Sequence, residues 1–331
     1  MKCLLLFFFC VCAHAQVAPP EHRRGPEQTF LTYPEWFLVH SPAEYAEYVR
    51  DHTPTQFPFI GHTCQFWQGY RAVTRATRDY PFNFGYHVMV MVIGSSTSVE
   101  YVIRAAYETM IGRLSELAAP RRLSEEDRYA AKVAQDYVDF IRDQPWYEYD
   151  FATKLADLWK ETSFFGPDFV RKWERKYALT TEYLIKGAYA WLIKKATKAA
   201  YEEPLPVTAV VIDRLPAGAQ NDLPEIKVLT ASKDSVLILL PRYYKFKQYA
   251  AGIAAKGGRF REIAGNGANA LILVSALVPA DWQSDGLLFE QPVLTRPQTK
   301  RAVLAVPVGS LATLLNRLAG DGARLEHVYD Y

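Results

Sequence analysis

A few histidines and carboxylates in the first third of the chain are the residues best suited to acid–base chemistry. Two carboxylates with a histidine between them could transfer protons if a pocket brought them together. An arginine and a tryptophan nearby would add an anion contact and an apolar wall. The residues that we select on this basis as candidate binding or catalytic residues are Glu35, Trp36, His62, His87, Glu100 and Arg104.

No established catalytic or cofactor motif accompanies these residues. The chain contains no H-E-x-x-H, G-x-S-x-G, P-loop or G-x-G-x-x-G sequence. His62 and Cys64 are two residues apart, but a lone H-x-C pair is a weak metal signal, and ordinary packing is the favoured role. The sequence therefore predicts no metal site, and it leaves the catalytic residues and any cofactor unidentified.

Three aromatic clusters are a further signal, at residues 33–37, 66–70 and 145–151. Tyrosine and tryptophan combine an apolar body with a polar tip, so they line ligand pockets and interfaces as well as cores. Core packing is the favoured interpretation of these clusters, because it requires no ligand.

The first 15 residues are typical of a cleavable signal peptide. Lys2 precedes an apolar run at residues 3–12, and Ala13-His14-Ala15 supplies a small-residue cleavage site. The run is about half of the ~20 residues that a membrane-spanning helix needs. We therefore expect export to the periplasm or the extracellular space, with Cys64 as the single cysteine of the mature chain.

The composition fits a globular protein with a large core. Hydrophobic residues make up 50% of the chain and aromatic residues 14%, and 38 basic residues oppose 36 acidic ones. Without Lys2, the mature charge is +1 (37 against 36). This balance gives no indication of a nucleic-acid partner.

The mature chain divides into three parts by pattern. Residues 16–28 are polar and rich in proline and glycine, and we expect a flexible linker there. Residues 29–203 have mainly helical periodicity, and residues 204–331 alternate short β-branched runs with turn residues. Inspection finds no internal repeat.

In the helical part, two amphipathic helices are predicted at residues 99–118 and 168–201. Their apolar stripes, which include Val99 and Leu114 in the first and Tyr177 and Leu184 in the second, are expected to be buried. The charged stripe of Glu100, Arg104 and Glu108 is expected to face water. Arg113 lies on the apolar stripe and should extend its head to solvent.

Three shorter features complete the helical part. Ser124, followed by acidic residues, predicts the N-cap of another helix. Residues 84–93 are too few to span a membrane and indicate a buried strand or the start of a core helix, stopped by the run at residues 94–98. The lysines near residue 195 suit a helix C-terminus, with membrane-surface contact as the alternative.

The C-terminal part predicts an antiparallel sheet with two helices, so the expected class is α+β. The order of elements resembles a ferredoxin-like sandwich with extra strands. The strands are expected at residues 207–213, 225–231, 235–240, 259–263, 270–278, 287–294, 301–308 and 324–329, and the helices at 244–255 and 310–318.

Three of these strands, within residues 236–240, 270–274 and 302–306, are apolar without alternation. Because neighbouring side chains point to opposite faces of a strand, both faces of the sheet must be covered. The N-terminal helices are the favoured cover, and a second copy of the domain is the alternative.

Four segments, at residues 29–36, 146–151, 171–175 and 326–331, resemble an uncharacterised family of bacterial exported envelope proteins. The resemblance extends over most of the mature chain. It implies an envelope location and no particular activity.

The sequence supports three functional hypotheses. The leading one is an exported binding or structural protein that uses aromatic surfaces to bind a protein partner or a small apolar ligand, with peripheral membrane contact or homodimer formation as further options. The second is an enzyme with an acid–base site in the helical part or in the cleft between the two parts. The third is haem binding by a histidine of the helical part. Convergence of His62 or His87 with a carboxylate in a water-accessible pocket would favour the enzyme.

Overall fold

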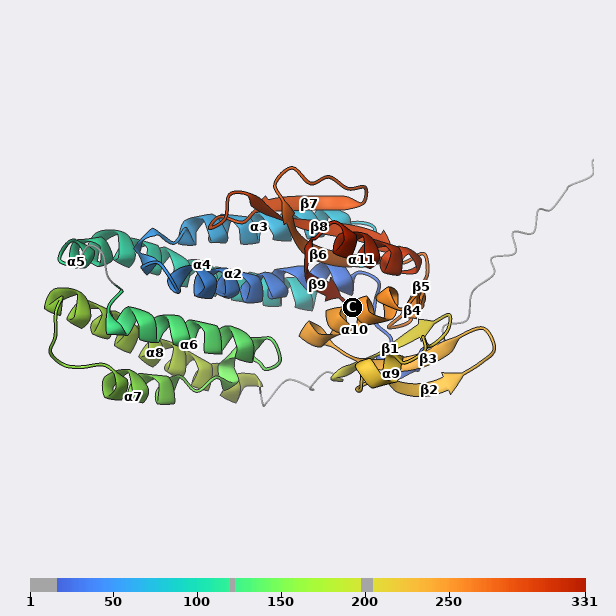
Figure 1. Ribbon diagram of the computed structural model, residues 1–331, viewed down its shortest axis with the longest axis horizontal. Coiled ribbons are helices and arrows are strands. Elements are labelled where there is room, and N and C mark those ends of the chain that lie inside the picture. Colours follow the sequence, from blue (N-terminus) through green and yellow to red (C-terminus); the bar gives the residue numbers. More distant parts are fainter. Residues whose placement is uncertain (1–16, 120–122, 198–204) are drawn as a thin grey trace, which may run out of the picture.

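Helices dominate the first two thirds of the protein and antiparallel strands the last third, which confirms the predicted α+β class (Figure 1). The computed structural model describes residues 17–119, 123–197 and 205–331. The predicted signal peptide lies outside the described residues.

The helical part is built mainly from long helices. Its elements are η1 (Pro20–His22), α1 (Gln28–Leu31), α2 (Tyr33–Val49), η2 (Pro54–Gln56), α3 (Phe59–Ala76), α4 (Phe84–Tyr107), the π-helical turn η3 (Glu108–Gly112), α5 (Arg113–Leu117), α6 (Glu125–Ile141), η4 (Trp146–Glu148), α7 (Phe151–Glu161) and α8 (Phe169–Thr197). Ser124 caps α6 as predicted, because its hydroxyl accepts the Asp127 N–H and the Asp127 carboxylate accepts the Ser124 N–H.

The expectation that residues 94–98 would end an element is wrong, because α4 continues through them. A side chain at Gly94 would collide with the Phe66 ring, so glycine here permits close packing of α3 on α4. The Ser96 and Ser98 hydroxyls donate to carbonyls of the preceding turn, and Trp67 Nε1 donates to Ser98 Oγ at 3.0 Å. Packing and local hydrogen bonds thus override weak helix propensity.

The α+β part contains the predicted strands and helices, but the strands form two sheets rather than one. The sheet order is β2-β3-β1-β4-β5 in the first and β7-β8-β6-β9 in the second. The elements are β1 (Val207–Ile212), α9 (Ala219–Asp222), β2 (Lys227–Ala231), β3 (Val236–Pro241), η5 (Tyr243–Lys245), α10 (Phe246–Ala255), β4 (Phe260–Ile263), β5 (Asn266–Gly267), β6 (Leu271–Pro279), β7 (Leu287–Pro292), β8 (Thr299–Pro307), η6 (Val308–Ser310), α11 (Leu311–Gly320) and β9 (Arg324–Tyr329).

The two sheets repeat one arrangement. Each unit has a first strand, a hairpin, a helix and a last strand, which gives the equivalent orders β2-β3-β1-β4 and β7-β8-β6-β9 with antiparallel pairing throughout. In both units the register shifts where the first strand meets the last, at Val211/Ile212 and at Ser275/Ala276. This part of the chain is therefore a tandem duplication of one βββαβ unit at the level of topology.

Local signals in the sequence repeat with nearly the same spacing, because the strand-ending proline and the glycine after the helix are 16 residues apart in the first unit and 15 in the second (257 − 241 and 322 − 307). Pro241 and Pro307 end the equivalent strands β3 and β8. Gly257 and Gly322 follow the equivalent helices in left-handed conformation, with φ of 81° and 69°. Inspection of the sequence missed this repeat because the units share turn chemistry and burial pattern more than residue identity.

The prediction that the uninterrupted apolar strands are buried on both faces is confirmed for the second sheet, and the N-terminal helices are its cover. Val274 and Leu304 face α10 and α11 in a core shared with the first sheet. Leu273 and Val303, their neighbours in sequence, pack instead against aromatic residues of α1, α2 and α3. Figure 1 shows α2 and α3 alongside this sheet.

Hydrogen bonds fix the helical part on the sheet. The Leu273 N–H donates to Thr29 Oγ1 at 2.9 Å, and that hydroxyl donates to the Tyr329 carbonyl at 2.7 Å. The Tyr33 hydroxyl donates to Gln291 Oε1 at 2.9 Å, and Gln291 Nε2 donates to the Gln65 carbonyl at 2.7 Å. The aromatic cluster at residues 33–37 is thus part of a core, as favoured.

The expected flexible linker is instead docked over its described residues. The N–H groups of Val17 and Ala18 donate to the Glu262 carboxylate at 3.0 and 2.8 Å, and the Arg24 N–H donates to the Ala264 carbonyl. Ala18 is buried against the outer face of the first sheet, beside Val211. The Glu262 carboxylate, the Ala264 carbonyl and an apolar sheet face explain why this segment is ordered.

We predict that Leu273→Ala and Leu304→Ala each lower the free energy of unfolding by about 2–5 kcal/mol, because each opens a cavity in one of the two cores that flank the sheet. Urea denaturation of the purified protein measures this. Leu229→Ala, at a half-exposed position of β2, is the control and should change stability by less than about 0.5 kcal/mol. An equally small effect of Leu273→Ala would show that the sheet face that carries Leu273 is exposed to solvent.

Candidate functional site

Helices α4 and α8 have their charged side turned inward. Four cations of α8 are buried, and Arg171 is only 1% exposed. By contrast, Ile103 on α4 is 62% exposed. The buried cations are Arg171, Lys172, Arg175 and Lys176.

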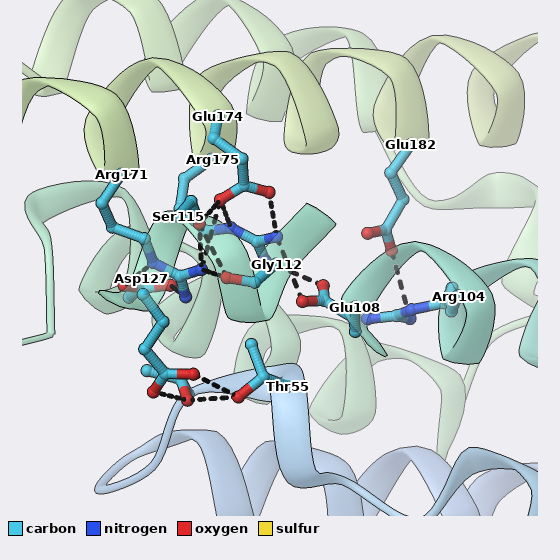
Figure 2. Close-up of polar contacts among 12 residues, drawn as sticks. Thr55, Arg104, Glu108, Gly112, Ser115, Asp127, Arg171, Glu174, Arg175 and Glu182 are labelled. Atoms are coloured by element: carbon cyan, nitrogen blue, oxygen red, sulfur yellow. Dashed lines mark hydrogen bonds and ion pairs between the residues drawn. The ribbon is translucent and has the colours of Figure 1, made fainter. Parts of the chain in front are cut away.

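Carboxylates from neighbouring helices pair with these cations (Figure 2). Arg171 Nη2 lies 2.9 Å from Asp127 Oδ1 of α6, and Arg175 Nη1 lies 2.9 Å from Glu108 Oε1. Lys172 Nζ lies 2.9 Å from the carboxylate oxygens of both Glu125 and Glu126. Most of the charge on this side of α8 is therefore neutralised within the bundle.

The π-helical turn η3 places two of these groups. A π turn inserts an extra residue and frees backbone carbonyls. The Gly112 carbonyl accepts from Arg171 Nη1 at 3.3 Å and from Ser115 Oγ at 2.8 Å. A side chain at Gly112 would collide with the Glu108 carboxylate, so glycine leaves room for the Glu108–Arg175 pair.

Glu100 and Arg104, two of the candidate residues, join α4 to α8. Arg104 Nη1 lies 3.4 Å from Glu182 Oε1, and Lys186 Nζ lies 3.1 Å from Glu100 Oε1. Burial alone would raise the pKa of Glu182, but Arg104 and Lys186 lower it to about 2. From Glu100 to Arg104 to Glu108, the residue numbers rise along α4 and into η3, while the numbers of their partners on α8 fall. Helices α4 and α8 are therefore antiparallel neighbours.

The predicted orientation of both helices is therefore wrong. The stripes expected to be buried are exposed or half-exposed, and the stripe of Glu100, Arg104 and Glu108 faces inward. Periodicity identified the stripes correctly, but it carries no information about which stripe meets the rest of the protein. Arg113 is exposed, as expected.

We call the outer surface of these helices the apolar face. Its large residues on α4, η3 and α5 are Phe84, Val88, Met89, Met91, Val92, Val99, Val102, Ile103, Met110, Ile111, Leu114 and Leu117. Its large residues on α8 are Phe169, Val170, Tyr177, Leu184, Ile185, Tyr189, Trp191 and Leu192. Contiguous exposed apolar surface on this scale marks an interaction site.

Helix length also sets the apolar face apart. Within the part of the chain that the structure describes, one helix, Phe84–Leu117, is long and apolar enough to cross a membrane by length and composition. Only 17% of its most apolar window is buried.

A second group of charges lies between α2, α3 and the second sheet. Arg301 of β8, 1% exposed, donates to Glu44 Oε1 at 2.6 Å and to Glu326 Oε1 at 2.9 Å. His62 Nε2 lies 3.6 Å from Glu44 Oε2, and His40 Nε2 lies 3.6 Å from Glu326 Oε2. We call these five residues the central cluster.

A β-bulge builds the central cluster. The register of β6 with β9 shifts between Ser275 and Ala276, which leaves Glu326 without an opposite residue. Glu326 therefore reaches the same side as His327, although adjacent residues of a regular strand point to opposite faces. His327 is buried and its ring stacks on Trp36 at 3.6 Å, but neither ring nitrogen is hydrogen-bonded to a described residue.

Burial also shapes the charge states of the cluster. It lowers the pKa of His40 and that of His62 to about 3, so both imidazoles are neutral. Burial alone would raise the pKa of Glu326, but the Arg301 guanidinium outweighs it, and the pKa is about 2. Arg301 and Glu326 are therefore a charged pair beside two neutral histidines.

The remaining candidates, Glu35 and His87, lie apart from the central cluster. Burial raises the pKa of Glu35 to about 7, against the opposing effects of Tyr86 and Arg242. His87 Nδ1 lies 2.8 Å from the Tyr70 hydroxyl, and its ring stacks on Phe82 at 4.5 Å. The structure thus divides the six candidates among three places.

Sequence reasoning missed Glu44, Arg301 and Glu326, which complete the central cluster. One signal was present in the sequence. Arg301 lies near the start of an apolar strand, and a buried arginine needs an acidic partner. Its partners lie 257 and 25 residues away, and one of them is placed by the bulge. No spacing in the sequence reports that arrangement.

Two cavities adjoin these groups. One lies among α2, α4, α6 and α8, and its charged lining residues, including Arg104 and Glu182, are already paired. The other is lined by His62 and by the hydroxyls of Ser41 and Tyr101. Each has room for about one water molecule. No group of three potential metal ligands occurs among the described residues.

Comparison with protein-family models, with curated proteins and with solved structures found no match. The resemblance to bacterial envelope proteins therefore stays a prediction.

We predict that Arg171→Met lowers the free energy of unfolding by about 3–5 kcal/mol, because it leaves the buried Asp127 carboxylate without its cation, whereas Glu174 keeps Arg175. Chemical denaturation measures the change. Lys132→Met is the control: its pair with Glu161 is exposed, so the cost should stay below about 1 kcal/mol. Equal effects of the two substitutions would contradict a buried network.

We also predict an acid-sensitive stability. The folded-state pKa of His62, about 3, lies below the unfolded value of 6.5, so unfolding takes up a proton within that window. This contribution is fully present above pH 6.5 and is lost as the pH falls toward 3. In His62→Gln, the slope of unfolding free energy against pH between 6 and 5 should fall by up to about 1.4 kcal/mol per pH unit.

Phe57→Leu controls for lost packing, because Phe57 stacks on the His62 ring but does not titrate. It should lower the stability equally at each pH. A wild-type slope in His62→Gln would rule out the proposed charge state of this histidine.

Proposed function

We propose that this protein is an exported interaction protein whose apolar face is covered by a binding partner in the functional state. The observation that carries the proposal is the inverted polarity of α4 and α8, with paired charges inside and leucine, isoleucine, methionine and aromatic side chains outside.

The energetics favour this interpretation. Each large apolar side chain left in water forgoes about 1.5–3 kcal/mol of burial free energy. The buried ion pairs compensate for little of this lost burial free energy, because the cost of desolvating the charges cancels most of their attraction. In water alone, an arrangement with the apolar stripes inside would be the more stable one. The observed arrangement becomes favourable once apolar matter covers the outer face.

The aromatic clusters identified in the sequence are not the proposed surface. Residues 33–37 and Phe66 belong to the core between the helices and the second sheet, and Tyr149 and Phe151 belong to the core of the α6–α8 bundle. The exposed large aromatic residues of the described chain are others, at the N-terminal end of α4 and just before or along α8: Phe82, Phe84, Phe164, Phe165, Phe169, Tyr177, Tyr189 and Trp191.

The enzyme alternative rests on one observation, the approach of His62 to Glu44 beside the smaller cavity. Both residues are buried, and the cavity beside them has room for about one water molecule, far less than a small-molecule site needs. The same volume does not favour haem binding by His62. We therefore rank the acid–base and haem alternatives below the interaction protein.

We predict that the double variant Ile103→Gln/Leu184→Gln loses the ability to bind apolar matter while it keeps its fold. Sedimentation velocity of the purified mature protein in a mild nonionic detergent measures this. The wild type should sediment with bound detergent or as a dimer, and the variant as a detergent-free monomer with an unchanged melting temperature.

The matched control is Val228→Gln/Leu229→Gln, which makes the same polar replacement at exposed apolar residues of β2. It should behave as the wild type does. A wild-type protein that sediments as a detergent-free monomer would refute the proposal.

A further inference from the structure

We infer that the partner of the apolar face is an anionic phospholipid bilayer, on which α4 and α8 lie flat. This inference rests on the proposed function, and it names the partner.

The first support is the shape of the face. The ion pairs Arg104–Glu182 and Lys186–Glu100 hold α4 and α8 side by side and antiparallel, and Arg175–Glu108 continues the contact toward α5. The exposed residues of both helices therefore form one elongated surface. Interfacial helices bury such a surface to the depth of the headgroup and upper acyl region.

The second support is the charge pattern. Among the exposed residues of α4, η3, α5 and α8, over the part of α8 whose side chains are described, the charged ones are Arg113 and Lys195. Both are cations. The acids Glu100 and Glu116 are partly exposed: Glu100 is paired with Arg104 and Lys186, and Glu116 accepts hydrogen bonds from the Thr53 and Thr55 hydroxyls. A surface whose fully exposed residues are apolar or cationic complements a bilayer that contains anionic lipids.

The same pattern disfavours a second copy of the chain as the cover. Two apolar faces brought together would place Arg113 and Lys195 of both copies in one interface without exposed carboxylates to pair with them. Unpaired like charges in an interface cost several kcal/mol in general. A bilayer avoids this cost, because the long side chains can extend to lipid phosphates.

The aromatic residues fit the same partner. Trp191 is exposed, and Lys195 Nζ lies 3.9 Å from the centre of its ring. Tryptophan next to lysine is typical of the boundary between headgroups and acyl chains. Phe165 and Phe169 extend the face at the other end of α8.

The surroundings favour helices that lie on the membrane over helices that span it. Helix α6 packs along α8, and its exposed residues include Glu125, Arg128, Lys132 and Asp139. A transmembrane orientation of α8 would carry this charged surface into the hydrocarbon, where each charge costs about 2.5 kcal/mol or more in general.

Flotation of the purified mature protein with phospholipid vesicles tests the inference. Vesicles contain phosphatidylcholine alone or with one third phosphatidylglycerol. We expect the wild type to float with the anionic vesicles and Ile103→Gln/Leu184→Gln to stay at the bottom of the gradient. We expect Arg113→Gln/Lys195→Gln to weaken binding to anionic vesicles about twenty- to thirty-fold, since each cation contributes about five-fold.

Arg128→Gln/Lys132→Gln, which removes two exposed cations of α6, is the matched control and should float as the wild type does. Equal flotation of Arg113→Gln/Lys195→Gln and the wild type would overturn the preference for anionic lipid. Absence of wild-type flotation would overturn the bilayer as partner.

Sedimentation then separates the two proposals. A wild-type dimer that Ile103→Gln/Leu184→Gln converts to a monomer would leave the interaction protein intact, with a second copy as its partner. A wild-type monomer that binds neither vesicles nor detergent would contradict both the interaction protein and the bilayer as its partner.

Discussion

The inward pairing of charges between α8 and its neighbours is the constraint on which the helical part depends. Once Arg171 and Arg175 have turned toward Asp127 and Glu108, the opposite side of α8 must face outward, and that side is apolar. The pairs with Glu182 and Glu100 impose the same orientation on α4. The ion pairs and the apolar face are thus two consequences of one arrangement, and the face is where this protein has the most to gain from a partner.

The second sheet links this bundle to the rest of the molecule. It is one of two equivalent βββαβ units, and both contribute to the core around α10 and α11. The units differ in what covers their outer faces. In one, the cover is the aromatic surface of α1–α3; in the other, it is the short segment that includes Ala18. Two units of one topology thus have different neighbours, and the larger neighbour, the helical part, carries the apolar face on α4, η3, α5 and α8.

The central cluster lies at the junction of the sheet with α2 and α3. A guanidinium between two carboxylates, with neutral histidines beside it, is costly to bury and depends on good geometry. Its members come from α2, α3, β8 and β9, so it forms only when the helices dock on the sheet in the correct register. We interpret the central cluster as the set of contacts that specifies how the helices dock on the sheet. The predicted acid sensitivity of the fold follows from its buried neutral histidines.

The sequence by itself determined the α+β class, the positions of the strands, the Ser124 cap and the need to cover both faces of the apolar strands, because these depend on local periodicity and turn chemistry. Only the tertiary structure decided that Val99 and Leu184 face outward, that two sheets form, that Glu326 meets Arg301 and Glu44, and that Glu35 and His87 lie apart from His62. The physical reason is that the spacing of apolar residues along a helix is the same whether that side of the helix faces the core or the solvent. Which side faces the core is set by residues distant in the sequence, and here these are the carboxylates that pair with the charged side of α8.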